Sequence, residues 1–239
     1  MQGRWSARRP DGLEQLASRP KAGGRNVVRQ PRLTGAQRQR SIIEAAADVF
    51  ARRGYEGARI EEIASAADVS KALIYEHFQG KRELYAHIMR TGTQEHLRRV
   101  LEATVQVEGS VQRMEHGLRA FLDFVAENPT LWRVIEQEVS DPEIIALDQS
   151  QQKRGEAAIA QMLAGDEEIA RQNLSPRKLD LLAVMINGAS VRAANWWIEN
   201  PSMERDEVLL HMMRFMWLGL ERIRSADRDG NPSLNGRPA

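Results

Sequence analysis

The chain has 239 residues, of which 28% are charged, and its net charge is only +1, a composition typical of a folded protein rather than a disordered one. It contains no cysteine, which excludes disulfide bonds and thiolate metal sites. No apolar run approaches the ~20 residues of a membrane-spanning helix, and the N-terminus lacks the apolar segment of a secretion signal. The expected compartment is the cytosol, with no membrane partner.

Charge is distributed unevenly along the chain. Residues 1–32 carry eight Arg or Lys against two acidic residues, whereas residues 91–239 carry seventeen basic residues against twenty-three acidic ones. A basic N-terminal segment followed by an acidic remainder is typical of a protein that binds a polyanion at one end. Proline and glycine interrupt residues 1–33, so this basic leader is expected to be disordered. It either adds contacts to nucleic acid or is an unused tail.

Helical periodicity dominates the sequence between the leader and a Gly- and Pro-containing tail, residues 225–239, which is also expected to be disordered. Serine residues that suit helix caps, such as Ser70, Ser175 and Ser202, precede three of the predicted helices. The pattern indicates an all-α fold with an N-terminal three-helix domain over residues 34–82 and a larger helical domain over residues 83–224. The predicted helices span residues 37–53, 60–67, 71–78, 81 onward, 111–127, 131–139, 143–163, 177–199 and 203–224.

The second and third predicted helices have the spacing of a helix-turn-helix unit, since a three-residue turn separates two helices of eight residues. The apolar positions expected to pack inward, together with Phe50, are Ile63, Val69, Ile74 and Phe78. The positions left on another face of the third helix are Lys71, Leu73, Tyr75 and His77. A DNA major groove admits one helix of this kind. On spacing alone, an ordinary helical hairpin with a solvated face is an equally good interpretation.

The residues themselves favour the first interpretation. The segment GYEGARIEEIASAADVSKALIYEHFQGKRELY, residues 54–85, closely resembles the DNA-binding segment of the TetR family of transcriptional repressors. The matching features are Gly54-Tyr55, Ile63-Ala64, Val69-Ser70-Lys71, Ile74-Tyr75, Phe78, Lys81 and Leu84. The resemblance covers residues 34–90, and beyond them it implies architecture only.

This resemblance implies roles for individual residues. The positions that would face DNA from the third helix are Ser70, Lys71, Leu73, Tyr75 and His77. Among them, Tyr75 and His77 would contact phosphate groups. Lys81 would add a cation at the N-terminus of the fourth helix, an end that already favours phosphate.

The segment departs from the family pattern at three positions. Arg59 stands where Thr or Ser usually caps the second helix, which removes a cap but offers a cation for a phosphate. Asp68 replaces the usual turn glycine, and aspartate tolerates the left-handed backbone that such a turn requires. Leu73 cannot donate a hydrogen bond and would contribute an apolar contact, such as one to a thymine methyl group.

The rest of the chain carries no catalytic constellation. No two of its five histidines are four residues apart, and neither an HExxH motif nor a nucleotide-binding glycine loop is present, so neither an enzyme nor a metal or cofactor site is expected. Residues 177–199 and 203–224 carry more apolar side chains than one core face needs. The resemblance implies that these last two helices pair with those of a second copy, with Leu209 as one residue of the seam, whereas burial within one protomer is the competing account.

Apolar and aromatic residues of the larger domain could also line a cavity for a small apolar effector. The candidate ligand-binding residues are Phe121, Phe124, Trp132, Met162, Met185, Asn187, Arg192 and Trp196. The complete hypothesis is a homodimeric repressor that binds palindromic operator DNA and is released when an effector enters this cavity. The alternative is a DNA-binding regulator whose larger domain docks a protein partner, which a filled core with an exposed apolar groove would favour.

Overall fold

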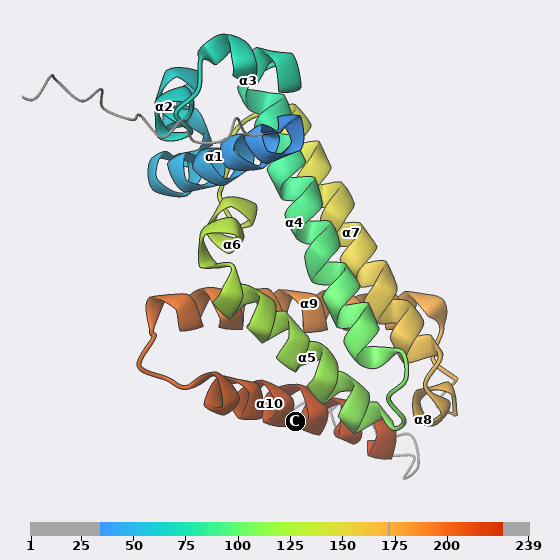
Figure 1. The fold of residues 1–239 in the computed structure, drawn as a ribbon. Helices are drawn as coiled ribbons and strands as arrows, with labels where there is room; N and C mark the ends of the chain where they lie inside the picture. The colour runs from blue at the N-terminus through green and yellow to red at the C-terminus, as the bar shows by residue number, and fades with distance from the viewer. Residues whose placement is uncertain (1–33, 172, 227–239) are drawn as a thin grey trace, which may run out of the picture. The chain divides into compact units, whose positions relative to one another are not determined.

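The computed structural model describes residues 34–171 and 173–226, and Figure 1 shows their helices. The predicted leader, residues 1–33, lies outside the described residues, as does most of the predicted tail. The described residues form ten α-helices and no β-strand, which confirms the all-α prediction. The helices are α1 (Gly35–Gly57), α2 (Ile60–Ala66), α3 (Lys71–His77), α4 (Lys81–Thr104), α5 (Ser110–Glu127), α6 (Pro129–Ile135), α7 (Pro142–Ala164), α8 (Glu167–Ala170), α9 (Pro176–Glu199) and α10 (Arg205–Ala226).

The first three helices and the first turns of α4 form what we call the head. α1 is broken at Gly54, whose φ of 72° is one that glycine adopts without steric cost. Asp68 adopts a φ of 52° in the turn between α2 and α3, as predicted from its tolerance of that conformation. The hydroxyl of Ser70 caps α3 by accepting a hydrogen bond from the Leu73 N–H at 3.2 Å, whereas Arg59 provides α2 with no side-chain cap.

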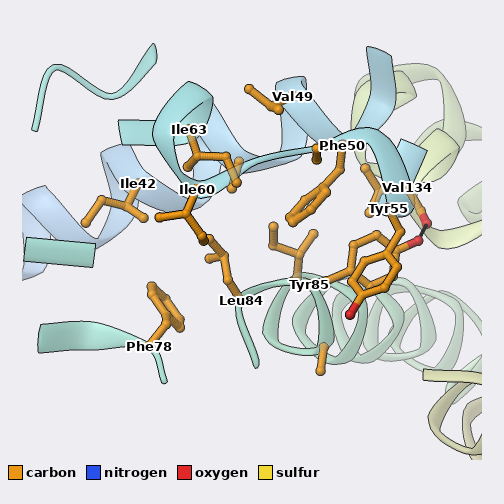
Figure 2. Close-up of a cluster of buried hydrophobic side chains, with 14 of the residues drawn as sticks. Ile42, Val49, Phe50, Tyr55, Ile60, Ile63, Phe78, Leu84, Tyr85 and Val134 are labelled. Atoms are coloured by element: carbon orange, nitrogen blue, oxygen red, sulfur yellow. Dashed lines mark hydrogen bonds between the residues drawn. The ribbon is translucent and has the colours of Figure 1, made fainter. Parts of the chain in front are cut away.

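The core of the head is built around three aromatic rings (Figure 2). The rings of Phe50 and Tyr55 each meet the ring of Tyr85 edge-on, with centroids 4.9 Å apart in both pairs. Such edge-to-face pairs add to the free energy that burial of the rings supplies. The predicted inward packing of the helix-turn-helix is confirmed, because Ile63, Ile74 and Phe78 are buried in this core.

The core of the head continues into α6 and α7. Val134 of α6 and Ile144 of α7 are buried in the same cluster of side chains. The hydroxyl of Tyr85 donates to the carbonyl oxygen of Val134 at 2.7 Å, which satisfies both polar groups inside this apolar region. A movement of α6 or α7 therefore acts directly on the packing of the head.

The remaining helices, together with the rest of α4, form what we call the body. α4 contacts α5, α7 contacts α9, and α5 also contacts α10. These helices are labelled in Figure 1. A second core of buried side chains joins α5, α6, α9 and α10, with Leu122 and Phe124 fully buried in it. Among the described residues, no helix combines the length and apolar character needed to cross a bilayer.

The structure differs from the predicted helices mainly in the body. α8 has only four residues, too few to show a periodic apolar pattern in the sequence. Ser175 precedes α9 without making a side-chain cap, and α10 begins at Arg205, so Ser202 lies in the preceding turn. α10 also extends to Ala226, two residues into the predicted tail.

Candidate DNA-binding surface and ligand cavity

α3 presents one apolar face and one exposed polar face. Ile74 is fully buried and Phe78, directly after the helix, is 3% exposed, whereas Tyr75 is 54% exposed. Ser70 and Lys71 are exposed at the N-terminal end of the helix. The structure therefore places a phenol and an ammonium group beside each other on the outside of a helix that the core of the head holds in position.

The Lys71 ammonium group is paired within the head. Its Nζ lies 2.6 Å from Oε1 of Glu61 on α2, and both side chains are exposed. The hydrogen bond from Lys71 lowers the pKa of Glu61, and the same bond raises the pKa of Lys71. Because both groups face solvent, the pair contributes little to the stability of the fold. Its main effect is to hold the Lys71 charge near the carboxylate when no polyanion is present.

The other predicted DNA-facing residues are less uniformly exposed. Leu73 is half-buried and packs against the core of the head, so only part of its side chain is available to a base. His77 is also half-buried, with its ring 6.5 Å from the ring of Phe78. Arg59 is exposed directly before α2.

The predicted role of Lys81 needs correction. Its Nζ donates to the carbonyl oxygens of Tyr55, Glu56 and Ala58, at 2.8, 3.3 and 3.3 Å. The same ammonium group lies 4.6 Å from the centroid of the Tyr55 ring. An ammonium group has three N–H donors, so these contacts use all of them. Lys81 therefore joins α4 to the end of α1 instead of pointing to a phosphate group.

Residues 136–141 connect α6 to α7 and bind the head through several polar contacts; we call this segment the strap. Gln137 Nε2 donates to the carbonyl oxygen of Phe50 at 2.7 Å. Asp141 Oδ2 accepts hydrogen bonds from Tyr55 Oη at 3.0 Å and from Arg82 Nε at 2.8 Å. The Arg82 hydrogen bond holds the pKa of Asp141 below its ordinary value, whereas burial is the main cause that raises the pKa of Tyr55.

The body contains an apolar cavity of about 140 Å³. An engineered cavity of roughly this volume in another protein holds a benzene molecule. Four helices supply most of the wall, namely α4, α5, α7 and α9, and Asp166, Ile169 of α8 and Trp217 of α10 supply the rest. The polar or charged residues on the wall are few: His96, Ser110, Arg113, Asp166, Asn187 and Ser190.

One end of the cavity lies where α5 begins and α7 ends. Asp166 is buried there and accepts hydrogen bonds from the Ser110 hydroxyl and, at 3.1 Å, from the Ile169 N–H. Arg113, one turn into α5, donates from Nε and Nη2 to the carbonyl oxygen of Val107 at 3.3 and 3.2 Å. A guanidinium group has five N–H donors, so Arg113 keeps further donors for another acceptor. We call this the Arg113 end.

The other end of the cavity is bordered by aromatic rings. The ring of His96 lies 5.1 Å from that of Phe121 and 5.3 Å from that of Phe124, and Trp132 stands behind them. Burial lowers the pKa of His96 to about 4, so its imidazole is neutral at neutral pH. The Trp132 indole N–H donates to Asn195 Oδ1 at 2.7 Å. The aromatic cluster therefore links this end of the cavity to α6, which bears Trp132.

The predicted ligand-binding residues fall into three groups. Phe121, Met162 and Asn187 line the cavity. Phe124 and Trp132 are buried in the aromatic cluster and do not belong to the cavity wall, so they support the wall from behind.

Three predicted ligand-binding residues are on the wrong side of α9. Met185 is 60% exposed, Trp196 is 49% exposed, and Arg192 is also exposed. The cavity is lined instead by Ile186, Asn187 and Ser190 of the same helix. Residues 185, 192 and 196 share one helical face, and Ile186 and Ser190 share another. At these three positions the sequence therefore predicted the correct helix but the wrong face of it.

Six of the large exposed apolar side chains of the body lie on α9 and α10. We call them the apolar stripe, which consists of Leu181, Val184, Met185, Trp196, Leu210 and Phe215. Phe215 is 74% exposed. Leu209, predicted to lie in a seam between copies, is only 4% exposed and is buried in the second core of its own protomer. That prediction was wrong because Leu209 and Leu210 point to different sides of α10.

Sequence reasoning missed several residues of the cavity wall. His96 and Arg113 were not singled out because an isolated histidine and an isolated arginine on amphipathic helices carry no spacing signal. Gly155 was missed as well, although a glycine in the interior of a 23-residue helix is an available signal, since glycine disfavours helix.

Two family models match this chain. Residues 42–88 match the model described as bacterial regulatory proteins of the tetR family, and residues 111–219 match the tetracyclin repressor-like C-terminal domain. The chain is also 30% identical over 181 residues to the HTH-type transcriptional repressor SCO4008 of Streptomyces coelicolor, across 75% of this chain and 85% of that protein. The chain belongs to the TetR family of transcriptional regulators. Its relatives regulate transcription through a helix-turn-helix and are not enzymes.

Two further comparisons agree with this membership. The chain is 28% identical to the HTH-type transcriptional activator FasR of Mycolicibacterium smegmatis over 86% of this chain and 91% of that protein. The fold is similar to that of the fatty acid degradation regulator FadR from Bacillus halodurans, with a TM-score of 0.67 and 20% identity over 75% of this chain and 94% of that one. One curated relative is thus named an activator and another a repressor, so the family alone does not fix the sign of regulation.

Proposed function

We propose that this TetR-family regulator is a homodimeric, cytosolic repressor that reads operator DNA with α3 and releases it when a small apolar molecule enters the body. The observation that carries the DNA-binding part is the phase of α3, which buries Ile74 and leaves Lys71 and Tyr75 outside. Ser70, Leu73 and His77 complete the proposed reading surface, and Arg59 supplies a further phosphate contact. Lys81 is not part of the proposed reading surface.

The apolar stripe supports the homodimer. Exposed side chains of this size along two long helices are unusual for a free monomer surface and suit burial against a second copy. Two-fold symmetry would bring the stripe of one protomer against the same stripe of the other. A dimer would also present two copies of α3 to successive major grooves of a palindrome, about 34 Å apart.

The cavity supports a small-molecule effector over the alternative of a protein partner. A filled core with an exposed groove would have favoured a protein, whereas the body contains an apolar space lined by three of the predicted ligand-binding residues. A structurally similar protein is named a fatty acid degradation regulator, which agrees with an effector that has a substantial apolar part. The effector acts only to the extent that it binds one arrangement of the head better than another.

The aromatic cluster and the strap provide a physical connection for this switch. A ligand that displaces Phe121 or His96 presses on Trp132 and thus on α6, which is continuous with the strap. The strap holds the head through Gln137 and Asp141. A coupling of about 3 kcal/mol along this connection would weaken operator binding roughly 100-fold.

The DNA-binding proposal is tested with an operator selected from a random-sequence library. Lys71→Ala is expected to weaken binding and to lower the salt dependence by about one phosphate contact, measured by fluorescence anisotropy across a salt series. Lys153→Ala, which removes the same charge from an exposed position on α7, is the control and should change neither quantity. Equal effects of the two variants would show that α3 does not contact the DNA backbone through Lys71.

A further inference from the structure

Glycines in the interiors of α4, α5, α7 and α9 meet different surroundings. A Cβ atom built at Gly92 would lie 2.9 Å from a methyl group of Leu131, and one at Gly117 would lie 3.3 Å from a methyl group of Thr104. These two glycines are therefore explained by close packing of neighbouring helices. Gly155 of α7 and Gly188 of α9 are different, because a Cβ atom at either position would meet nothing within 4 Å, and of these two only Gly155 belongs to the cavity wall.

Neither the backbone nor the packing explains glycine at position 155. The residue lies in the interior of a regular 23-residue helix and has no left-handed φ. Alanine would stabilise the helix at this place and would fit without a clash. Gly155 does, however, belong to the wall of the cavity. The absent side chain therefore leaves open space beside the cavity at a cost to helix stability.

The register of the helices gives the order of residues along the cavity. On α7 the wall residues run from Gly155 through Ala158, Ile159 and Met162 to Leu163, and Asp166 follows at the Arg113 end. On α5 the order is reversed, from Ser110 and Arg113 to Phe121. Eight residues separate Gly155 from Leu163 and Arg113 from Phe121, so each helix covers about 12 Å between the two ends. Gly155 thus lies toward the aromatic end.

The two ends offer different chemistry to a ligand. The Arg113 end has a guanidinium group with unused donors, and the two Asp166 oxygens are already occupied by Ser110 and Ile169. The aromatic end has the neutral His96 ring and Phe121. The wall between them is mostly apolar, with Asn187 and Ser190 of α9 as its polar members. This arrangement suits a linear molecule with an anionic head, such as a carboxylate, and an apolar chain.

We propose that the absence of a side chain at Gly155 lets the cavity accept a long apolar chain, with the carboxylate of the ligand at Arg113. This inference rests on the proposed effector site and specifies its ligand class. A side chain at position 155 would project into the path of the chain about 12 Å from the Arg113 end. Short chains would end before this point, and longer chains, which must widen the cavity beyond its present volume of about 140 Å³, would pass over the glycine.

The test measures binding of straight-chain carboxylates, from hexanoate to palmitate, by calorimetry to the full chain and to Gly155→Leu. The parent is expected to bind longer chains more tightly until the cavity is filled. Gly155→Leu should bind the shortest chains unchanged but lose affinity for long ones. Loss of about three methylene groups from the apolar site corresponds to a roughly 50-fold weaker dissociation constant. Gly155→Ala should show a smaller loss.

Two controls separate this effect from a general disturbance of the fold. Ala157→Leu places the same side chain on an exposed position of α7 two residues away and should leave the chain-length profile unchanged. The melting temperature of Gly155→Leu without ligand should equal or exceed that of the parent, since open space surrounds the site. A clear fall in that temperature would show that the space is not open and would overturn the proposal.

The head group is tested separately. Arg113→Gln should weaken binding of each carboxylate but not of the corresponding methyl ester, because the ester carries no charge to pair with the guanidinium group. Equal losses for acid and ester would remove the carboxylate assignment. Identical chain-length profiles for the parent and Gly155→Leu would overturn the role of Gly155 while leaving the effector site intact. Failure of the parent to bind any chain would overturn both.

Discussion

Phe50 in the head and Phe121 in the body are both aromatic residues on long helices, but they have different neighbours. The ring of Phe50 is fully buried against Tyr55 and Tyr85. The ring of Phe121 is 5% exposed, packs beside His96 and Trp132, and also borders the cavity. One ring has protein on all sides, whereas the other has space on one side.

This difference corresponds to two mechanical roles. The head must hold α3 in one position relative to DNA, and a core packed without voids resists displacement. The body must change its arrangement when a ligand arrives, and a cavity bordered by movable side chains allows it. The strap joins the body to the head. Binding of a ligand in the cavity of the body can therefore change the position of the head.

Replacement of Phe50 and Phe121 by alanine should give the largest difference in stability between the head and the body. Phe50→Ala is expected to lower the free energy of unfolding by about 3–5 kcal/mol, because it creates a new cavity in a filled core. Phe121→Ala enlarges a space that already exists and should cost clearly less, about 2 kcal/mol. Chemical denaturation followed by circular dichroism measures both. Equal losses would mean that the body is packed as tightly as the head.

Glutamate at two nearby positions of α10 should distinguish the core of the body from its apolar stripe. Leu209→Glu places a charge in the second core and should destabilise the protomer by about 3 kcal/mol. Phe215→Glu should leave the helical content unchanged but convert a dimer into a monomer, as measured by analytical ultracentrifugation. A dimer that survives Phe215→Glu would show that the stripe is not the interface.

Lys81 offers a test of the head that does not depend on the body. Lys81→Ala removes three hydrogen bonds to carbonyl oxygens and should lower the stability by about 2 kcal/mol. Its salt dependence of DNA binding should equal that of the parent, because its ammonium group is turned to the protein. A lowered slope with unchanged stability would restore the phosphate contact that the sequence predicted.

Acid should affect the body through His96. The folded protein holds this pKa at about 4, whereas an unfolded chain has a histidine pKa of about 6.5. The neutral ring therefore stabilises the fold fully above that unfolded value, and the contribution is lost as the pH falls toward 4. At pH 5.5 the loss is about 1.4 kcal/mol. Melting curves of His96→Phe should lack this part of the acid dependence that the parent shows.

The head could be predicted from the sequence almost completely. Its helices are short, its turn residues are distinctive, and its inward positions, such as Ile63 and Ile74, follow one helical period. Capping by Ser70 and the left-handed turn at Asp68 follow from local chemistry as well. Lys81 was the exception. The partners of a long flexible side chain depend on the tertiary structure, and the carbonyl partners of Lys81 are more than twenty residues away in the sequence.

The body could be predicted only in outline. α9 is apolar on more than one side because one face lines the cavity, another packs in the core and a third is exposed. A periodic pattern shows that such a helix exists but does not assign a partner to each face. Met185 and Asn187 illustrate this, since both were predicted to meet the ligand and only Asn187 lines the cavity.

The Lys71–Glu61 ion pair has a consequence for how selective the protein is among nucleic acids. A lysine on α3 without an acidic partner would bind any phosphate backbone. It would give up only a small anion or hydration water in exchange. Here Glu61 already occupies that place, at 2.6 Å from the ammonium group. A DNA phosphate must displace this carboxylate and leave it beside a polyanion. Binding at random sites is thereby discouraged, and only an operator whose bases also contact α3 compensates for the exchange.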